Sequence, residues 1–422
     1  MKKILCFFIV VSILLTGCTQ QPNAQRGSED QDQYNTILSK NGELSIVTKP
    51  ENLYINRGVI TKMPKYYGSE KSFSVDIRSG DLTKLDLSNN YNDLMHADFD
   101  SKTQWPSNLP EGFDPQKIME LGKNPGLGLY DIHKKGITGK GIGIAIIDGS
   151  LLVDHIEYKD QLKLYEEIHL LNGDTASMHG PAVASIAVGK TVGVAPEADL
   201  YYIACTHGVY KEEGGFEHDL KWYSKSIDRI IEINRTLPNE NKIRVISISF
   251  GIKSGRKGKK YVLNSIKRAE KEGIHTVFVG SNKFSGLGRD PLKSADNSTS
   301  FTEGKILQKL IKTGYESSNE HWKNQIKLKY GDSIFVPMDS RCFASPTGNN
   351  DYVFNRIGGC SWTVPYVAGL YALACQVNEN VTPETFWKEA SNTADILKYN
   401  NEEKLGLLVN PKNLLEKIEK LK

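Results

Sequence analysis

Four short runs of mostly apolar residues recur in the middle of this 422-residue chain. The runs span residues 141–147, 200–204, 245–250 and 276–279. Strands that are covered on both faces, as in parallel sheets, have this composition. Amphipathic stretches typical of helices lie between the runs, for example at residues 226–233 and 262–268. The alternation of strand and helix predicts an α/β fold with a doubly wound, mostly parallel sheet and helices on both of its faces.

The overall composition is that of an ordinary globular protein, because 39% of the residues are apolar and 24% are charged. The 53 basic and 50 acidic residues leave a net charge of +3, which gives no electrostatic argument for binding nucleic acid. A basic run at residues 253–260 is expected to be a solvated loop rather than a binding patch.

The first residues have the pattern of a secretory signal. Lys2 and Lys3 precede an apolar run over residues 4–15, which is too short to cross a membrane comfortably as a helix. The sequence Leu-Thr-Gly-Cys at residues 15–18 resembles the bacterial lipoprotein cleavage box. That resemblance implies removal of residues 1–17, acylation of Cys18 and a lipid-anchored, extracytoplasmic protein. The alternative is a plain secretory signal in which Cys18 is incidental.

Three further segments follow the predicted signal. Residues 18–42 are rich in polar residues and are expected to be a flexible tether. Residues 43–119 contain short alternating stretches typical of strands, at 44–47 and 73–77. They are predicted to be a small, β-rich N-terminal extension that wraps around the main domain, or a pro-region. Residues 120–422 are expected to form the main domain.

Polar residues with catalytic potential stand beside the apolar runs. Asp148 ends the first run, and an Asn follows the fourth run in Gly280-Ser281-Asn282. Functional groups gather at the carboxyl ends of strands in doubly wound sheets. His179-Gly180 opens another apolar stretch, and Gly359-Cys360-Ser361 precedes a long one. Residues 120–395 resemble the subtilisin-like serine peptidase (subtilase) family, which has its catalytic Asp, His and Ser in this order.

The resemblance implies a role for each of these residues. Ser361 is the expected nucleophile, and His179 is the expected base that takes its proton and returns it to the leaving amine. Asp148 would orient the imidazole and stabilise its charged form. Asn282 and the backbone N–H of Ser361 would donate hydrogen bonds to the oxyanion. The expected activity is that of a serine endopeptidase.

Several residues depart from the family pattern and keep a second hypothesis open. The usual Asp-Ser/Thr-Gly reads Asp148-Gly149-Ser150 here, the usual His-Gly-Thr-His reads His-Gly-Pro-Ala from His179, and Ser281 replaces a glycine. Trp362 follows the nucleophile and is expected to reshape the leaving-group side of the cleft. The alternatives are therefore a catalytically inactive, peptide-binding relative and, outside the family, a lipid-anchored binding protein.

Two segments resemble those that line the primary specificity pocket of the family. The candidate substrate-binding residues are Ser249, Phe250, Gly251, Val279 and Gly280. The expected partner is an extended peptide or protein that pairs with these segments as an added strand. Because neither segment contains an acidic residue, the sequence predicts an apolar or small side chain before the cut. We expect a monomer.

Cysteine and histidine spacing predicts neither a disulfide framework nor a metal site. The four cysteines of the main domain, without a CxxC pair, are expected to be small buried side chains: Cys205, Cys342, Cys360 and Cys375. The histidines without metal spacing are interpreted as structural or surface residues: His133, His169, His207, His218, His275 and His321. No cofactor is expected. Calcium stabilises many members of the family, but no 12-residue loop of alternating Asp and Asn ligands indicates it here.

Overall fold

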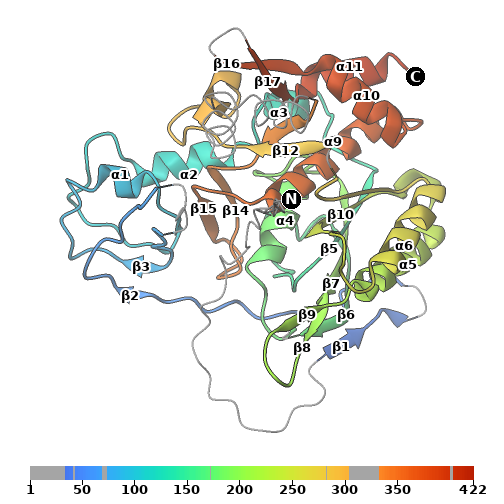
Figure 1. The fold of residues 1–422 in the computed structure, drawn as a ribbon, viewed down its shortest axis with the longest axis horizontal. Helices are drawn as coiled ribbons and strands as arrows, with labels where there is room; N and C mark the ends of the chain where they lie inside the picture. Colours follow the sequence, from blue (N-terminus) through green and yellow to red (C-terminus); the bar gives the residue numbers. More distant parts are fainter. Residues whose placement is uncertain are drawn as a thin grey trace, which may run out of the picture. The chain divides into compact units, whose positions relative to one another are not determined.

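The computed structural model describes residues 34–40, 43–68, 74–171, 173–281, 283–303, 332–399 and 403–422. A six-stranded sheet lies at its centre, in the order β1-β6-β7-β5-β10-β11 (Figure 1). Its strands span Tyr34–Ile37 (β1), Leu162–Leu171 (β6), Asp199–Cys205 (β7), Gly143–Asp148 (β5), Ile243–Gly251 (β10) and His275–Val279 (β11). The neighbours from β6 to β11 pair in parallel, whereas β1 is antiparallel to β6. The predicted α/β fold with a mostly parallel sheet is confirmed.

Four helices pack on the two faces of this sheet, and they span Lys221–Thr236 (α5), Lys259–Lys271 (α6), His179–Val188 (α4) and Thr363–Val377 (α9). The side chains of β5 alternate between two apolar clusters. Ala145 and Ile147 belong to the cluster that includes α5 and α6. Ile144 and Ile146 belong to the cluster that includes α4 and α9. The sheet is therefore doubly wound, and α4 and α9 share one face.

A second sheet of four strands, in the order β12-β13-β17-β16, lies beside α9. Its strands span Phe284–Leu287 (β12), Ile334–Pro337 (β13), Asp395–Tyr399 (β16) and Glu403–Leu408 (β17). Helices α10 (Pro383–Thr393) and α11 (Pro411–Glu419) complete this part, and each begins with a side-chain cap and a proline. No helix in the described ranges is both long and apolar enough to cross a membrane.

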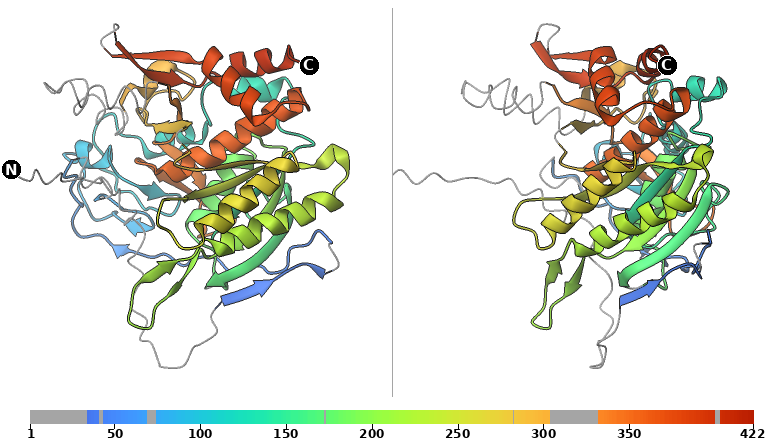
Figure 2. Two further views of the ribbon diagram at one scale, coloured as in Figure 1. Left: turned by 45° about the vertical axis from the view of Figure 1, so that its right-hand side comes forward. Right: turned by 90° about the vertical axis from the view of Figure 1, so that its right-hand side faces the viewer.

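The remaining elements are short. They are the strands Gly58–Val59 (β2), Gly80–Asp81 (β3), Phe99–Asp100 (β4), Gly208–Tyr210 (β8), Phe216–His218 (β9), Arg341–Ala344 (β14) and Tyr352–Asn355 (β15), the helices Tyr91–Leu94 (α1), Pro115–Lys123 (α2) and Leu129–Lys134 (α3), and the 3₁₀ helices Asn239–Asn241 (η3), Ser298–Glu303 (η4) and Cys360–Trp362 (η6). The hairpin β8–β9 follows β7 and projects from the central sheet in both views of Figure 2.

The predicted β-rich extension at residues 43–119 is present as short strands and single bridges. Ile46 bridges Tyr165 of β6, and Asp76 bridges Asp98. Turns that are held by aspartate side chains, such as that of Asp81, interrupt the strands. The extension has its own apolar cluster, which also contains side chains of β14 and β15. The extension therefore packs on β14 and β15 through this cluster.

Strand β1 corrects one boundary of the sequence analysis. It lies inside residues 18–42, which were predicted to be a flexible tether, and for Tyr34–Ile37 that prediction is wrong. The ring of Tyr34 stacks on that of His169 with centroids 3.9 Å apart, and the hydroxyl of Thr36 accepts the N–H of His169. The open edge of β6 supplies backbone partners that the local polar composition does not reveal.

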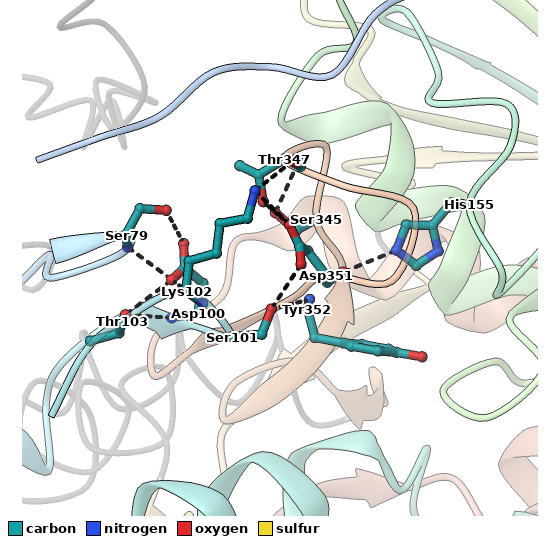
Figure 3. Close-up of polar contacts among 10 residues, drawn as sticks. All are labelled: Ser79, Asp100, Ser101, Lys102, Thr103, His155, Ser345, Thr347, Asp351 and Tyr352. Carbon is teal, nitrogen blue, oxygen red and sulfur yellow. Dashed lines mark hydrogen bonds and ion pairs between the residues drawn. The ribbon is translucent and has the colours of Figure 1, made fainter.

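The extension joins the main domain through a set of polar contacts between residues 99–103 and 345–352, here called the seam (Figure 3). Lys102 Nζ lies 2.9 Å from Asp351 Oδ2 and donates to the carbonyl of Thr347 at 2.7 Å. Asp100 accepts the backbone N–H and the hydroxyl of Ser79. Strand β4 adds to the antiparallel pair β14–β15. Backbone pairing and side-chain contacts thus fasten the two parts together.

Candidate active site

Asp148 and His179 form a hydrogen-bonded pair at the carboxyl end of the central sheet. Asp148 is the last residue of β5 and is buried, and His179 is the first residue of α4. His179 Nδ1 lies 2.7 Å from Asp148 Oδ1, which also accepts the backbone N–H of Gly149 at 2.8 Å. The bond to Asp148 places the proton of a neutral imidazole on Nδ1 and leaves Nε2 free as a base. The sequence analysis expected Asp148 to orient the imidazole of His179, and the structure places the two side chains in contact.

The charge of Asp148 determines how His179 binds its proton. Burial by itself disfavours the imidazolium, but the negative charge of Asp148 and the hydrogen bond to it outweigh burial. The pKa of His179 is therefore raised above its ordinary value. This electrostatic arrangement stabilises an imidazolium, which is the state that forms when a base takes a proton from a nucleophile.

Close packing explains Gly149, which departs from the family pattern, and Gly180, which keeps it. A Cβ at Gly149 would lie 2.8 Å from the hydroxyl of Ser177, and one at Gly180 would lie 2.6 Å from the carbonyl of Ser150. Ser177 Oγ accepts the N–H of Gly180 and donates to the carbonyl of Ser150. Pro181 stands in the first turn of α4, where its missing N–H has no intrahelical partner to lose. The altered motifs therefore keep His179 at the start of the helix beside Asp148.

Ser361 lies in η6, directly before α9, and is buried. Its hydroxyl donates to the carbonyl of Ser249 at 3.3 Å, and the hydroxyl of Ser249 donates back to the carbonyl of Ser361 at 2.9 Å. Within the described residues no hydrogen bond joins Ser361 to His179. Long or absent bonds between nucleophile and base are common when substrate is missing. The hydroxyl has to turn from Ser249 toward His179 before it can lose its proton there.

Trp362 packs between the base and the core. Its ring stacks on that of His179 with centroids 5.1 Å apart and an interplanar angle of 29°, and it contacts Phe343 at 4.8 Å. Its Nε1 is buried and has no partner among the described residues. The sequence analysis expected Trp362 to shape the leaving-group side of the cleft. Its observed contact is with the imidazole face, where the ring restricts the orientation of His179.

The candidate substrate-binding residues divide into two kinds. Ser249 is buried beneath Ser361 and supports the nucleophile segment rather than lining an open surface. Phe250 and Gly251 are half-buried at the end of β10, where the register with β11 shifts before Gly251 pairs with Val279. Gly280 is exposed and has a φ of +87°, a conformation that favours glycine. Because of this register shift, the ends of β10 and β11 do not pair residue by residue next to the segment of Ser361.

Some predicted residues lie outside the described part of the chain, and some described residues were overlooked. Asn282 and Cys18 belong to the first group. His207 and His218, interpreted above as structural or surface residues, contact Phe250 with ring centroids 4.1 and 5.5 Å away. The available signal was the position of His207 just after a buried strand. Among the described residues no three His, Cys, Asp or Glu side chains are grouped so as to hold a metal ion.

Comparison with known proteins relates this geometry to one family. Residues 139–408 match the model of the subtilase family. The subtilisin-like protease PopC of Myxococcus xanthus is 24% identical over 266 residues, which cover 57% of this chain and 53% of PopC. The major intracellular serine protease of Bacillus subtilis is 26% identical over 68% of this chain and 79% of its own. A solved structure, the prenylagaramide maturation protease PagA, has a TM-score of 0.45 at 15% identity over 69% of this chain and 98% of PagA.

Proposed function

Because this chain belongs to the subtilase family of serine proteases, we propose that it is an endopeptidase that uses Ser361, His179 and Asp148 as its catalytic residues. The observation that carries the proposal is the 2.7 Å contact between Asp148 and His179, beside the segment that contains Ser361. Asp148 and His179 are 31 positions apart in sequence and meet at the end of the sheet, and Ser249 of β10 bonds to the segment of Ser361. The three residues are of the chemical types that acyl transfer needs. The proposed substrate is an extended peptide or protein, and the enzyme acts as a monomer without a cofactor.

The reaction follows from these positions. Ser361 Oγ attacks the peptide carbonyl carbon while His179 Nε2 takes its proton, and Asp148 stabilises the resulting imidazolium. The tetrahedral oxyanion accepts hydrogen bonds from the backbone N–H of Ser361 and from the amide of Asn282. His179 then gives its proton to the leaving amine, and an ester remains on Ser361. Water, deprotonated by His179, hydrolyses that ester and regenerates the hydroxyl.

An inactive, peptide-binding protein is the second candidate, because the hydroxyl of Ser361 bonds to Ser249 rather than to His179. A fluorophosphonate probe distinguishes the two, since it reacts only with an activated serine. We expect the wild type to be labelled and to hydrolyse peptides, and Ser361→Ala to do neither while it remains folded. Ser254→Ala, on an exposed loop, is the control and should be labelled normally. A folded wild type that is not labelled would support the binding protein.

Asn282 has the least support from its neighbours, since Ser281 replaces the glycine of the family. If its amide stabilises the oxyanion, Asn282→Leu lowers kcat by about 10²–10³ with little change in KM. Titration of active sites corrects for misfolded enzyme. A normal rate per titrated site would leave the backbone donors alone in this role.

We also propose that the mature protein begins at Cys18, carries lipid there and is held outside the cytoplasm on the bacterial membrane. The sequence Leu-Thr-Gly-Cys at residues 15–18 supports this proposal. Cys18→Ala should release the protein from membranes and abolish labelling by a fatty-acid precursor. Labelling that persists in the variant would assign the anchor to another residue.

Residues 43–119 are proposed to remain in the active enzyme rather than to leave as a pro-region. Strand β4 and the seam support this, because removal would expose the apolar cluster that the extension shares with β14 and β15. The intact masses of the purified wild type and of Ser361→Ala test it. The two masses should differ only by the oxygen atom that the substitution removes, whereas a wild type that lacks the extension would contradict retention.

A further inference from the structure

A cluster of rings lies beside the nucleophile segment. It consists of Phe250 on β10 and the residues packed around it, here called the ring cluster: His207, Phe216, His218, Tyr223 and Arg256. His207 stacks on His218 with centroids 4.9 Å apart, and the guanidinium carbon of Arg256 lies 4.3 Å from the centre of the Phe250 ring. Tyr223 and Phe216 each contact His207, at 5.6 and 5.5 Å. Three of its six side chains carry nitrogen donors.

The backbone places this cluster next to the reacting groups. Strand β5 ends at Asp148, and its last pairing with β10 joins Ile146 to Ser247. Residues 249–251 of β10 extend past that point, so no strand of the described residues pairs with them on the β5 side. Ser249 is bonded to Ser361, and Phe250 is the next residue. A peptide that pairs with this free edge therefore passes over the ring cluster as it leaves the nucleophile.

An isolated bridge between two backbone segments fixes the donors in place. Asp219 bridges Lys257, and the N–H of Leu220 donates to the carbonyl of Lys257, so that His218 and Arg256 are held side by side. Burial lowers the pKa of His207 to about 3, with His218 and Arg256 as further causes, and burial also lowers the pKa of His218. His207 is therefore neutral, and Arg256 is the charged member of the group.

Two donors of the cluster have no partner. His218 Nδ1 and Arg256 Nη1 are both buried, and neither has a hydrogen bond within the described residues. The nearby acids are engaged elsewhere: Asp219 accepts the N–H of Lys221 and pairs with Lys257, and Glu217 lies near Lys211 and Lys257. Buried donors without partners are costly, and an added acceptor removes that cost. The cluster thus has an aromatic wall, a cation and two free donors.

On the premise of the proposed peptidase function, we propose that the ring cluster binds the carboxylate of an aspartate or glutamate side chain of the substrate. That side chain lies on the acyl side of the scissile bond, beyond the residue at the cut. Arg256 and His218 donate to the carboxylate, and Phe250 packs against its methylene groups. The sequence predicted an apolar or small side chain for the residue at the cut. That residue occupies a separate pocket.

The test compares matched peptides. A proteome-derived peptide library identifies the cleavage sites, and Asp or Glu is expected to be enriched at one acyl-side position. Two fluorogenic peptides are then made that differ only as Glu and Gln there. We expect the wild type to prefer Glu by at least about tenfold in kcat/KM, as one charge-assisted hydrogen bond provides. Equal rates for the two peptides would overturn the proposal.

Arg256→Gln and Lys257→Gln form a matched pair of variants, because the two residues are adjacent and lose the same charge. Only Arg256 lies on Phe250, whereas Lys257 is mostly exposed and pairs with Asp219. The preference for Glu should fall to within about twofold in Arg256→Gln and persist in Lys257→Gln. An equal loss in both variants would indicate long-range attraction by net charge and would overturn direct recognition.

Binding to Ser361→Ala separates this proposal from the peptidase function. Fluorescence anisotropy of the same two peptides measures affinity without turnover. A wild type that cleaves neither peptide would contradict the peptidase, yet tighter binding of the Glu peptide to Ser361→Ala would still support the cluster. Cleavage of both peptides with equal affinity would leave the peptidase and remove the acidic preference.

Discussion

The seam and the ring cluster are both polar and both join segments that are distant in sequence, but they differ in how their polar atoms are used. In the seam, the carboxylates of Asp100 and Asp351 and the ammonium of Lys102 all have partners (Figure 3). In the ring cluster, buried donors of His218 and Arg256 have none among the described residues. The seam is thus a structural contact in which the charged groups are paired, whereas the ring cluster has donors that an added acceptor could pair.

The same contrast extends to the catalytic centre. The pair of Asp148 and His179 is complete, whereas Nε1 of Trp362, the residue after Ser361, is buried and lacks a partner in the described ranges. A folded protein pairs nearly all of its buried polar groups, so an unpaired group beside the nucleophile is a candidate to bind a ligand. A change in the seam should therefore affect stability, and a change at the cleft should affect catalysis.

The largest expected effect is at Asp148. Asp148→Asn removes the charge that stabilises the imidazolium and changes the preferred tautomer of His179, so kcat should fall by about 10⁴. His179 acts as a base only when it is neutral, so wild-type activity rises with pH through its raised pKa. In the variant the residual activity should rise at lower pH, because the charge that raises this pKa is gone. Rate profiles over pH measure both effects, and an unshifted midpoint would contradict the role of Asp148.

An aspartate of the seam provides the opposite case. Asp100→Ala leaves the N–H and the hydroxyl of Ser79 and the N–H of Lys102 without this acceptor, and it should lower the free energy of unfolding by about 3 kcal/mol. The rate per active site of the folded enzyme should not change. Asp81→Ala is the control, since Asp81 holds a similar turn in an exposed position, and a much smaller loss is expected. Denaturant unfolding measures stability, and equal losses would remove the distinction between the two turns.

The smallest expected effect is at Asp98, a buried carboxylate beside the seam whose cost of burial is not fully offset by its neighbours. Burial raises the pKa of Asp98 to about 7, in spite of Arg78 and the N–H of Arg356. The folded state therefore binds a proton that the unfolded state has already released, and stability falls as the pH rises from about 4 to 7. Asp98→Asn should be more stable than the wild type by about 2 kcal/mol at pH 8 and similar to it at pH 4. A constant difference over this pH range would contradict the shifted pKa.

The sequence predicted those parts of the fold in which one segment contains its own signal. The apolar runs became β5, β7, β10 and β11, and Asp148 and His179 meet as their motifs indicate. The short strands of the second sheet were not predicted, because their pairing joins residues from 284 to 408 and no single segment contains the pattern. The ring cluster was missed for the same reason. His207, His218 and Arg256 are unremarkable in sequence and acquire their meaning only from Phe250.

The two segments that form the seam are synthesised early and late, because one lies in the first third of the chain and the other in the last third. The N–H of Tyr352 donates to Ser101 Oγ across 251 positions of the chain. Beside the seam, the N–H of Arg356 donates to Asp98 Oδ1 across 258 positions. Contacts of this separation close large loops and slow the search for the native state. During synthesis the extension therefore lacks its partner strands β14 and β15 until residues 341–355 have left the ribosome. Ser361 follows these residues closely in sequence. The contacts of the seam and the nucleophile therefore become available at the same late stage of synthesis.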